Sequence, residues 1–141
     1  MTAEPTFALL YRSEFDLTSL GSVRRAVSGC LILSGLPLER ADDATLAVAE
    51  MLGNAIEHGG GGGIIALTRE NRELHCVITD EGPGLPYGMD RPRREPVAPT
   101  AVDGRGLWLA YALCSAVTLH SSMHGTRVDL IMDLPADAPL R

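Results

Sequence analysis

The spacing of apolar residues along the chain predicts three helices and five strands. Apolar positions at helical spacing predict helices over Leu17–Ser34, from about Glu39 to His58, and from Gly104 to about Val117. Short apolar and β-branched runs between turn-forming residues predict the strands. The expected strands are Thr6–Tyr11, Ile64–Thr68, Glu73–Thr79, Thr118–Ser122 and Thr126–Met132.

Glycine and proline mark the boundaries of these elements. Gly35 ends the first helix and Pro37 prevents its continuation, while the five glycines Gly59–Gly63 end the second. The segment Gly82–Asp103 contains five prolines and is too rich in them for a helix or an inner strand. Loops of this length inside a compact domain are usually functional or disordered.

The order of elements is β-α-α-β-β-loop-α-β-β, in which strands follow one another in pairs. Such pairs favour an α+β fold, a two-layer α/β sandwich with helices on one face of a mixed, mostly antiparallel sheet. The chain of 141 residues is the size of one domain, so we expect a single domain over residues 1–141 with its core at about 7–134. The tail, Pro135–Arg141, is expected to fray.

Composition excludes several classes of function. The net charge of −6 argues against direct nucleic-acid binding, which depends on basic patches. All 12 basic residues are Arg, so a P-loop lysine and Schiff-base chemistry are excluded. No apolar run is long enough for a membrane span, and Met1–Phe7 does not read as a signal peptide, so we expect a cytoplasmic protein. Cys30, Cys76 and Cys114 lack metal or redox spacing and are expected to be reduced core residues.

The second predicted helix carries polar residues on one stripe of an otherwise apolar sequence. Glu50, Asn54 and His58 are spaced four residues apart and therefore lie above one another on the helix surface. A carboxylate in such a helix must be paired, ligated or directed into a wet cleft. A solvated strip is the alternative interpretation.

A glycine-rich turn follows the third predicted strand. Asp80 ends this strand, and its carboxylate can accept a hydrogen bond from an exocyclic amine such as that of adenine. Gly82 and Gly84 allow the backbone to turn sharply and to approach a ligand. An ordinary turn after a strand is the alternative.

Two further motifs lie near the C-terminal elements. Gly104-Arg105-Gly106-Leu107 leads from the long loop into the third helix, where free backbone N–H groups favour phosphate. The sequence Gly125-Thr126 begins the last strand, where an inward hydroxyl can help to hold a base. Each motif alone is also compatible with a purely structural role.

In this order and at these separations, the four motifs resemble those of the Bergerat-fold ATPases and kinases, the superfamily that includes gyrase and the histidine kinases. Within it, the chain is most similar to the anti-sigma regulatory serine/threonine kinases, the switch-protein kinases of Gram-positive bacteria. Two features carry this likeness, the short segment 85–103 in the position of the ATP lid and the motif Gly104-Arg105-Gly106-Leu107-Trp108-Leu109-Ala110. The similarity extends from about Phe7 to Leu134.

The resemblance implies ATP or ADP and Mg²⁺ as ligands. By it, Asn54 coordinates Mg²⁺ through its side-chain oxygen, and Glu50 is the general base that takes the proton of a target serine. Asp80 reads adenine, Gly82 and Gly84 shape the base pocket, and Thr126 helps to hold the base.

The remaining implied roles concern the phosphates and the pocket wall. Gly104, Gly106 and the adjoining amides cradle phosphates, and Leu107 completes that motif. Arg105 either neutralises phosphate charge or faces a protein partner, and His58 supports the pocket. The lid carries Arg91, Arg93 and Arg94 in a setting that does not match the family position by position, so its contacts stay unassigned.

The function implied is that of an ATP-dependent anti-sigma factor. Such a protein binds a sigma factor and phosphorylates a serine of an anti-anti-sigma protein of the STAS fold, and its relatives commonly form homodimers. Two alternatives stay open: a nucleotide-responsive binding module without useful kinase activity, and a detached catalytic domain of a histidine kinase. Neither the sigma factor nor the antagonist is identified by the sequence.

Overall fold

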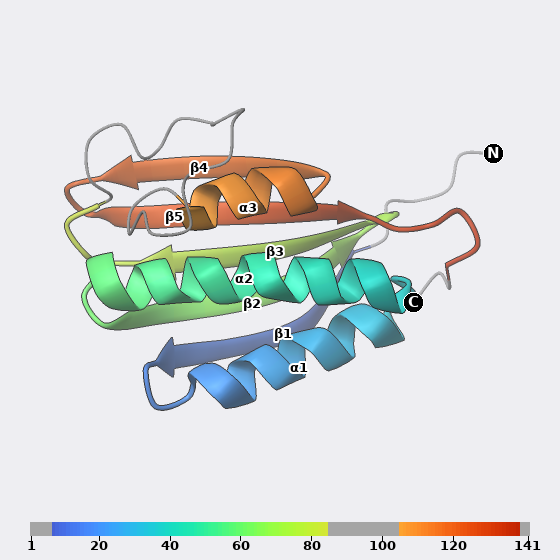
Figure 1. Cartoon of the computed structure of the whole chain (residues 1–141), viewed down its shortest axis with the longest axis horizontal. Helices are drawn as coiled ribbons and strands as arrows, with labels where there is room; N and C mark the ends of the chain where they lie inside the picture. The colour runs from blue at the N-terminus through green and yellow to red at the C-terminus, as the bar shows by residue number, and fades with distance from the viewer. Residues whose placement is uncertain (1–6, 85–104, 139–141) are drawn as a thin grey trace.

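A five-stranded sheet carries three helices on one of its faces (Figure 1). The structure, a computed structural model, describes residues 7–84 and 105–138. The elements are β1 (Phe7–Asp16), α1 (Leu20–Leu33), α2 (Leu38–His58), β2 (Gly62–Glu70), β3 (Glu73–Asp80), α3 (Arg105–Leu113), β4 (Ala116–Ser122) and β5 (Gly125–Asp133). The predicted order of elements and the α+β class are confirmed.

The strands lie in the order β1-β2-β3-β5-β4, and all four neighbouring pairs among them are antiparallel. The sequence predicted a mixed, mostly antiparallel sheet. In the structure, every pairing between the described strands is antiparallel. The central pair, β3 and β5, places Asp80 opposite Thr126. Two of the predicted site residues therefore meet at one end of the sheet.

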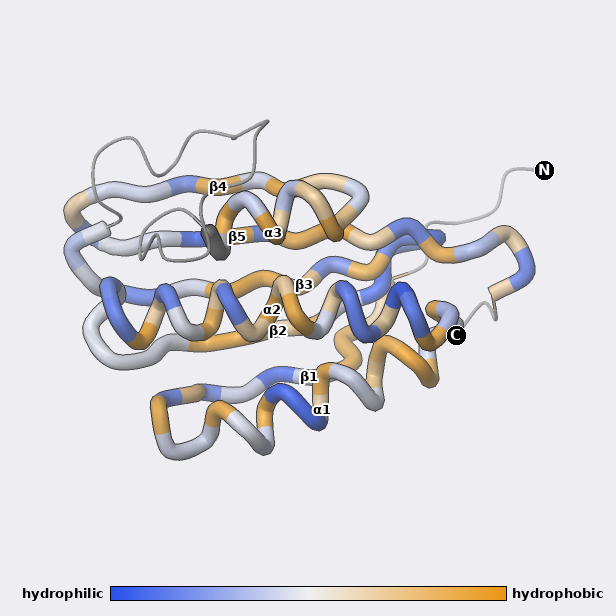
Figure 2. Tube along the Cα trace, viewed as in Figure 1, coloured by the Kyte–Doolittle hydropathy of each residue, from blue (hydrophilic) through white to orange (hydrophobic). Residues whose placement is uncertain are grey.

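The core lies between the sheet and its helices. Helix α2 contributes the longest buried stripe, α1 packs against β1 and α2, and α3 packs against α2. In Figure 2 apolar residues recur along α2 between hydrophilic ones, as expected for a helix with one buried face. Buried strand residues alternate, as in Leu74, Cys76 and Ile78 of β3.

Several element boundaries differ from those predicted. Helix α1 begins at Leu20 rather than Leu17, because the Asp16 carboxylate accepts hydrogen bonds from the backbone N–H groups of Thr18 (2.9 Å) and Ser19 (3.1 Å) and stabilises a turn there. Strand β1 continues to Asp16 beyond the predicted end at Tyr11, since its polar residues alternate with inward ones.

Helix α3 ends at Leu113, not near Val117 as predicted. The backbone N–H of Ser115 donates to the carbonyl of Ile131 (2.8 Å), which turns the chain into strand β4 at Ala116. The apolar run that continues through Val117 therefore belongs partly to a strand, where Val117 pairs with Leu130.

The tail is held as far as Ala138, so the prediction that it frays from Pro135 is wrong for residues 135–138. Arg72 Nη1 donates to the carbonyls of Pro135 (3.2 Å) and Ala138 (3.0 Å), and Ala138 is buried. The tail is fixed because it satisfies a guanidinium that would otherwise lack partners.

Within the described ranges, no helix combines the length and the apolar composition needed to cross a lipid bilayer.

Candidate functional site

Four predicted site residues converge on one small pocket between α2, α3, β3 and β5. Asn54 comes from α2, Asp80 from the end of β3, Leu107 from α3 and Thr126 from the start of β5. The apolar part of the wall consists of Met51, Ala55, Ile78 and Val128. The pocket, called the base pocket below, thus combines an apolar lining with a few convergent polar groups, which is typical of small-molecule sites.

Asp80 is the ionisable group of the base pocket. Its Oδ1 accepts a hydrogen bond from the backbone N–H of Gly82 at 3.0 Å. Burial raises the pKa of the carboxyl group, and backbone hydrogen bonds from Gly82 and Thr126 offset only part of that effect. A partly desolvated carboxylate is suited to a ligand that donates hydrogen bonds, such as an exocyclic amine.

Glycines surround Asp80 because the backbone leaves no room for side chains there. A Cβ at Gly59 would lie 2.4 Å from Asp80 Cγ, and one at Gly82 would lie 2.4 Å from the Gly59 backbone. A Cβ at Gly125 would lie 2.2 Å from the Asp80 carbonyl oxygen. The end of α2, the turn after β3 and the start of β5 are therefore packed backbone to backbone around this carboxylate.

Gly84 has a different reason for being glycine. Its φ of 89° lies in the left-handed region, and a Cβ there would lie 2.3 Å from the carbonyl oxygen of Ser122. Gly84 thus positions the turn after β3 against the β4–β5 hairpin.

Thr126 is buried at the wall of the base pocket, with 7% of its surface exposed. Its hydroxyl shares a hydrogen bond of 2.9 Å with the hydroxyl of Ser121 on β4. This bond fixes the direction of the Thr126 hydroxyl, so β4 takes part in positioning a residue that sequence reasoning treated alone.

The polar stripe on α2 is only partly directed into the base pocket. Asn54 lines it, whereas Glu50 and His58 are half-buried on either side of Asn54 along α2 and are not part of its wall. His58 Nε2 lies 3.9 Å from the Glu57 carboxylate. Glu50 lies one helical turn before Asn54, on the same edge of the helix.

The motif that opens α3 is described in part. Helix α3 begins at Arg105, as predicted for a glycine-rich entry to a helix, and Leu107 is buried at 1% exposure against the base pocket. Gly104 and the lid segment 85–103 lie outside the described residues, and for Arg105 and Gly106 the structure describes the backbone alone. The phosphate-binding role of this motif stays a prediction.

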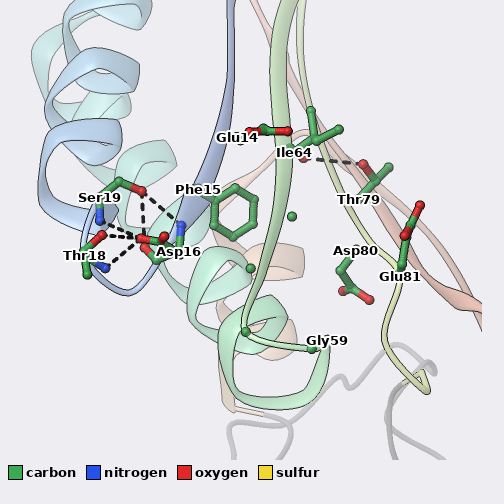
Figure 3. Close-up of a pocket in the computed structure, with 14 residues that line it drawn as sticks. Glu14, Phe15, Asp16, Thr18, Ser19, Gly59, Ile64, Thr79, Asp80 and Glu81 are labelled. Atoms are coloured by element: carbon green, nitrogen blue, oxygen red, sulfur yellow. Dashed lines mark hydrogen bonds between the residues drawn. The ribbon is translucent and has the colours of Figure 1, made fainter.

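A wider hollow of about 880 Å³ lies beside the base pocket and shares Asp80 with it. Figure 3 shows this hollow, with Asp80 and Glu81 near Gly59 and the bonded residues Asp16, Thr18 and Ser19 across from them. Its lining contains four carboxylates and no basic side chain. This charge disfavours phosphate groups, so the base pocket, and not the larger hollow, is the better candidate for a nucleotide.

The groups that line the base pocket suit an adenine base, but the cavity between them is too small to hold one. Its cavity of about 10 Å³ is close to the minimum for a single water molecule, about 10–15 Å³. Leu107 of α3 is buried there, and helix α3 follows directly after the segment in the position of the lid. A base would fit only if part of the pocket wall moved.

The side chains present also match a magnesium ion held in part by phosphate. Asn54 offers a neutral oxygen, a ligand type that Mg²⁺ accepts. The described residues hold no group of three or more His, Cys, Asp or Glu placed to bind a metal together. Mg²⁺ commonly binds through one or two protein ligands together with phosphate oxygens, so Asn54 is a suitable partner for a nucleotide-bound ion.

Sequence reasoning missed the close contact between Gly59 and Asp80 and the apolar wall of the base pocket. It treated Gly59 only as the end of a helix, because no local pattern reveals a contact between residues 21 positions apart. The wall residues Ile78 and Val128 carried a signal, since both alternate inward two positions from Asp80 and Thr126.

Comparison with known proteins gives one family match. The family model described as a histidine kinase-like ATPase domain matches residues 14–132. Signal transduction histidine-protein kinase AfsQ2 of Streptomyces coelicolor is 32% identical over 74 residues, which cover 49% of this chain and 14% of that protein. The chain thus spans a small part of that curated relative.

Solved structures agree on the fold. The structure of the RsbU and RsbW domains of Rv1364c from Mycobacterium tuberculosis matches with a TM-score of 0.61 and 19% identity, over 99% of this chain and 35% of that one. The histidine kinase domain of a blue-light activated histidine kinase from Erythrobacter litoralis EL346 matches with a TM-score of 0.54 and 21% identity, over 86% of this chain and 68% of that one. At these identities the likeness concerns the fold alone.

Proposed function

The chain belongs to the histidine kinase-like ATPase domain family, and on this premise we propose that it is an ATP-dependent anti-sigma factor and protein serine kinase. It binds a sigma factor and phosphorylates a serine of an anti-anti-sigma protein of the STAS fold, in the cytoplasm. The observation that carries the nucleotide part is the convergence of Asn54, Asp80, Leu107 and Thr126 on one pocket.

The positions of the residues support the roles proposed for them. Asp80 accepts the amine of adenine, and the Thr126 hydroxyl supports the base from β5. Asn54 holds the nucleotide-bound Mg²⁺ through its amide oxygen. When bound, Mg-ATP supplies the transferable phosphoryl group.

Glu50 acts as the general base for the acceptor serine. It stands one turn from Asn54 on the same helix edge, so the base and the metal ligand serve the same end of a nucleotide. Catalysis of phosphoryl transfer consists largely of such positioning and charge neutralisation. His58, one turn beyond Asn54, supports the pocket without touching the reacting atoms.

The kinase assignment is tested with radiolabelled Mg-ATP and candidate STAS-fold proteins encoded by the same genome. We expect an acid-stable label, as phosphoserine gives, on one of them. Glu50→Gln is expected to lower kcat by about 10²–10⁴-fold, the usual contribution of a general base. Glu57→Gln, on the exposed side of the same helix, is the matched control and should keep wild-type activity.

A second candidate function is that of a histidine-kinase catalytic domain, favoured by the 32% identity to AfsQ2. In that case the label appears on a histidine of a partner and is lost in acid. A protein that binds nucleotide but labels neither residue would be a nucleotide-responsive binding module, and the proposed kinase activity would be rejected.

A further inference from the structure

A second hollow opens at the turn between β4 and β5, next to the base pocket. It has a volume of about 460 Å³, and its lining includes Thr79, His120, Ser122, His124 and Arg127. We call it the hairpin groove. Most of these residues come from one tight hairpin, whose register is fixed by the pairing of Ser122 with Gly125.

The hairpin groove gathers three basic side chains in a chain that is acidic as a whole. Arg127, His120 and His124 supply guanidinium and imidazole donors, whereas the whole chain has a net charge of −6. All three side chains are exposed, and none of them has an ion pair or side-chain hydrogen bond within the part of the chain that the structure describes.

Two other described basic side chains are engaged within the molecule. His75 on β3 contacts the carboxylates of Asp129, Glu73 and Glu70 at 3.1–3.2 Å. Arg72 donates to two backbone carbonyls. Donors in the hairpin groove are instead left available to an acceptor from outside.

The register adds a reason for an anion to bind there. His120 lies directly opposite Arg127 in the β4–β5 pair, so their side chains project from the same face of the sheet. A carboxylate placed between them can accept a hydrogen bond from each, since imidazole and guanidinium both carry N–H donors.

The one carboxylate of the groove lining is directed elsewhere. Asp80 borders both the hairpin groove and the base pocket, but its side chain lies against Gly59 and accepts from Gly82. It therefore does not neutralise Arg127. Thr126 also borders both hollows, so a group bound in the groove touches the same strand ends that form the base pocket.

We propose that the hairpin groove is a docking site for an acidic segment of a protein partner, recognised through two or more carboxylates. A long polyanion such as RNA is disfavoured by the net charge of the chain, whereas a short peptide contacts only the basic side chains of the groove. The identity of the partner as kinase substrate or sigma factor rests on the proposed function. The binding of an acidic peptide is independent of the proposed function.

The test measures fluorescence anisotropy of a labelled octa-aspartate peptide titrated with the full chain at low salt, with an octa-lysine peptide as the opposite charge. We expect saturable binding of the aspartate peptide that depends on Arg127 and is weakened by added salt, whereas any binding of the lysine peptide to the acidic chain should not depend on Arg127. Arg127→Gln, and separately His120→Gln combined with His124→Gln, should raise Kd at least about tenfold, as loss of charge-assisted contacts does. Arg24→Gln, at an exposed arginine on α1, is the matched control and should change Kd by less than about twofold.

Three results would overturn the docking site. They are no saturable binding by the folded wild-type chain, an equal loss in Arg24→Gln, and tighter Arg127-dependent binding of an eight-nucleotide RNA than of the peptide. Melting temperatures of the variants separate lost binding from lost folding. If Mg-ATP fails to bind while the peptide binds through Arg127, the proposed function falls and the docking site stands.

Discussion

Asp80 is a residue whose position costs folding stability. Burial raises the pKa of its carboxyl group, so the folded state disfavours the charged form that is present at neutral pH. The contribution of Asp80 to folding stability is therefore most favourable at low pH. It is lost as the pH rises through the pKa that this carboxyl group has in the folded protein. Such a residue is retained at the end of a central strand most readily when the carboxylate serves a ligand.

His75 has the opposite relation to pH. Burial lowers its pKa, but hydrogen bonds to Asp129 and Glu73 and the charges of Asp129 and Glu70 outweigh burial and hold the pKa above its ordinary value. The stabilisation that His75 gives the fold is fully present below the ordinary histidine pKa of about 6.5. It is lost as the pH rises through the pKa of His75 in the folded protein.

We therefore predict that the melting temperature of the wild type falls more steeply than that of His75→Gln as the pH rises from just below 6.5 through that folded value. Thermal unfolding at a series of pH values measures this difference. His120→Gln, at an exposed histidine on β4, is the control and should follow the wild-type profile. Parallel curves for wild type and His75→Gln would contradict the linkage.

The glycines around Asp80 allow a paired test. Gly82→Ala places a Cβ 2.4 Å from the Gly59 backbone and is expected to destabilise the fold by about 1–3 kcal/mol, as overpacking does. Gly53→Ala on α2 meets nothing within 4 Å and should stabilise by about 0.5–1 kcal/mol through helix propensity. Urea denaturation measures both, and equal effects would contradict the close packing described for Gly82.

At the scale of elements, the sequence predicted helices and strands where periodicity is long and strong. Helix α2 was predicted within one residue, because its apolar period runs for five turns and ends at consecutive glycines. The end of α3 was misjudged, because the apolar run through Val117 suits a buried helix and an inner strand equally well. The order of neighbours in the sheet depends on contacts between distant strands, which no local pattern contains.

Helix α3 is the element that we expect to change position when a base enters the pocket. Leu107 is buried between α2 and the sheet, and the base pocket measures only about 10 Å³. We predict that saturating Mg-ADP changes backbone hydrogen exchange over Arg105–Leu113 while leaving α1 unchanged. Exchange measured by mass spectrometry tests this, and an α3 unaffected by bound nucleotide would refute the movement.

At the scale of the molecule, the base pocket and the hairpin groove share the strand ends that carry Asp80 and Thr126. The two hollows are formed by α2, α3, β3, β4 and β5. The motifs of the sequence named the polar residues of the base pocket, because Asp, Asn and glycine types signal chemistry locally. The small size of the base pocket and the hairpin groove were not predicted, since both arise only when the sheet brings distant segments together.

The central claim is that the base pocket binds Mg-ATP through Asp80. The most direct measurement is the melting temperature with and without millimolar Mg-ATP and Mg-ADP, in the wild type and in Asp80→Asn. A ligand at a hundredfold over its Kd stabilises the fold by about 2.7 kcal/mol, a shift on the order of 5 °C for a domain of this size. We predict that shift in the wild type and none in Asp80→Asn, whose own melting temperature without nucleotide is not lowered. No shift in the wild type at saturating nucleotide, or an equal shift in Asp80→Asn, would contradict the account.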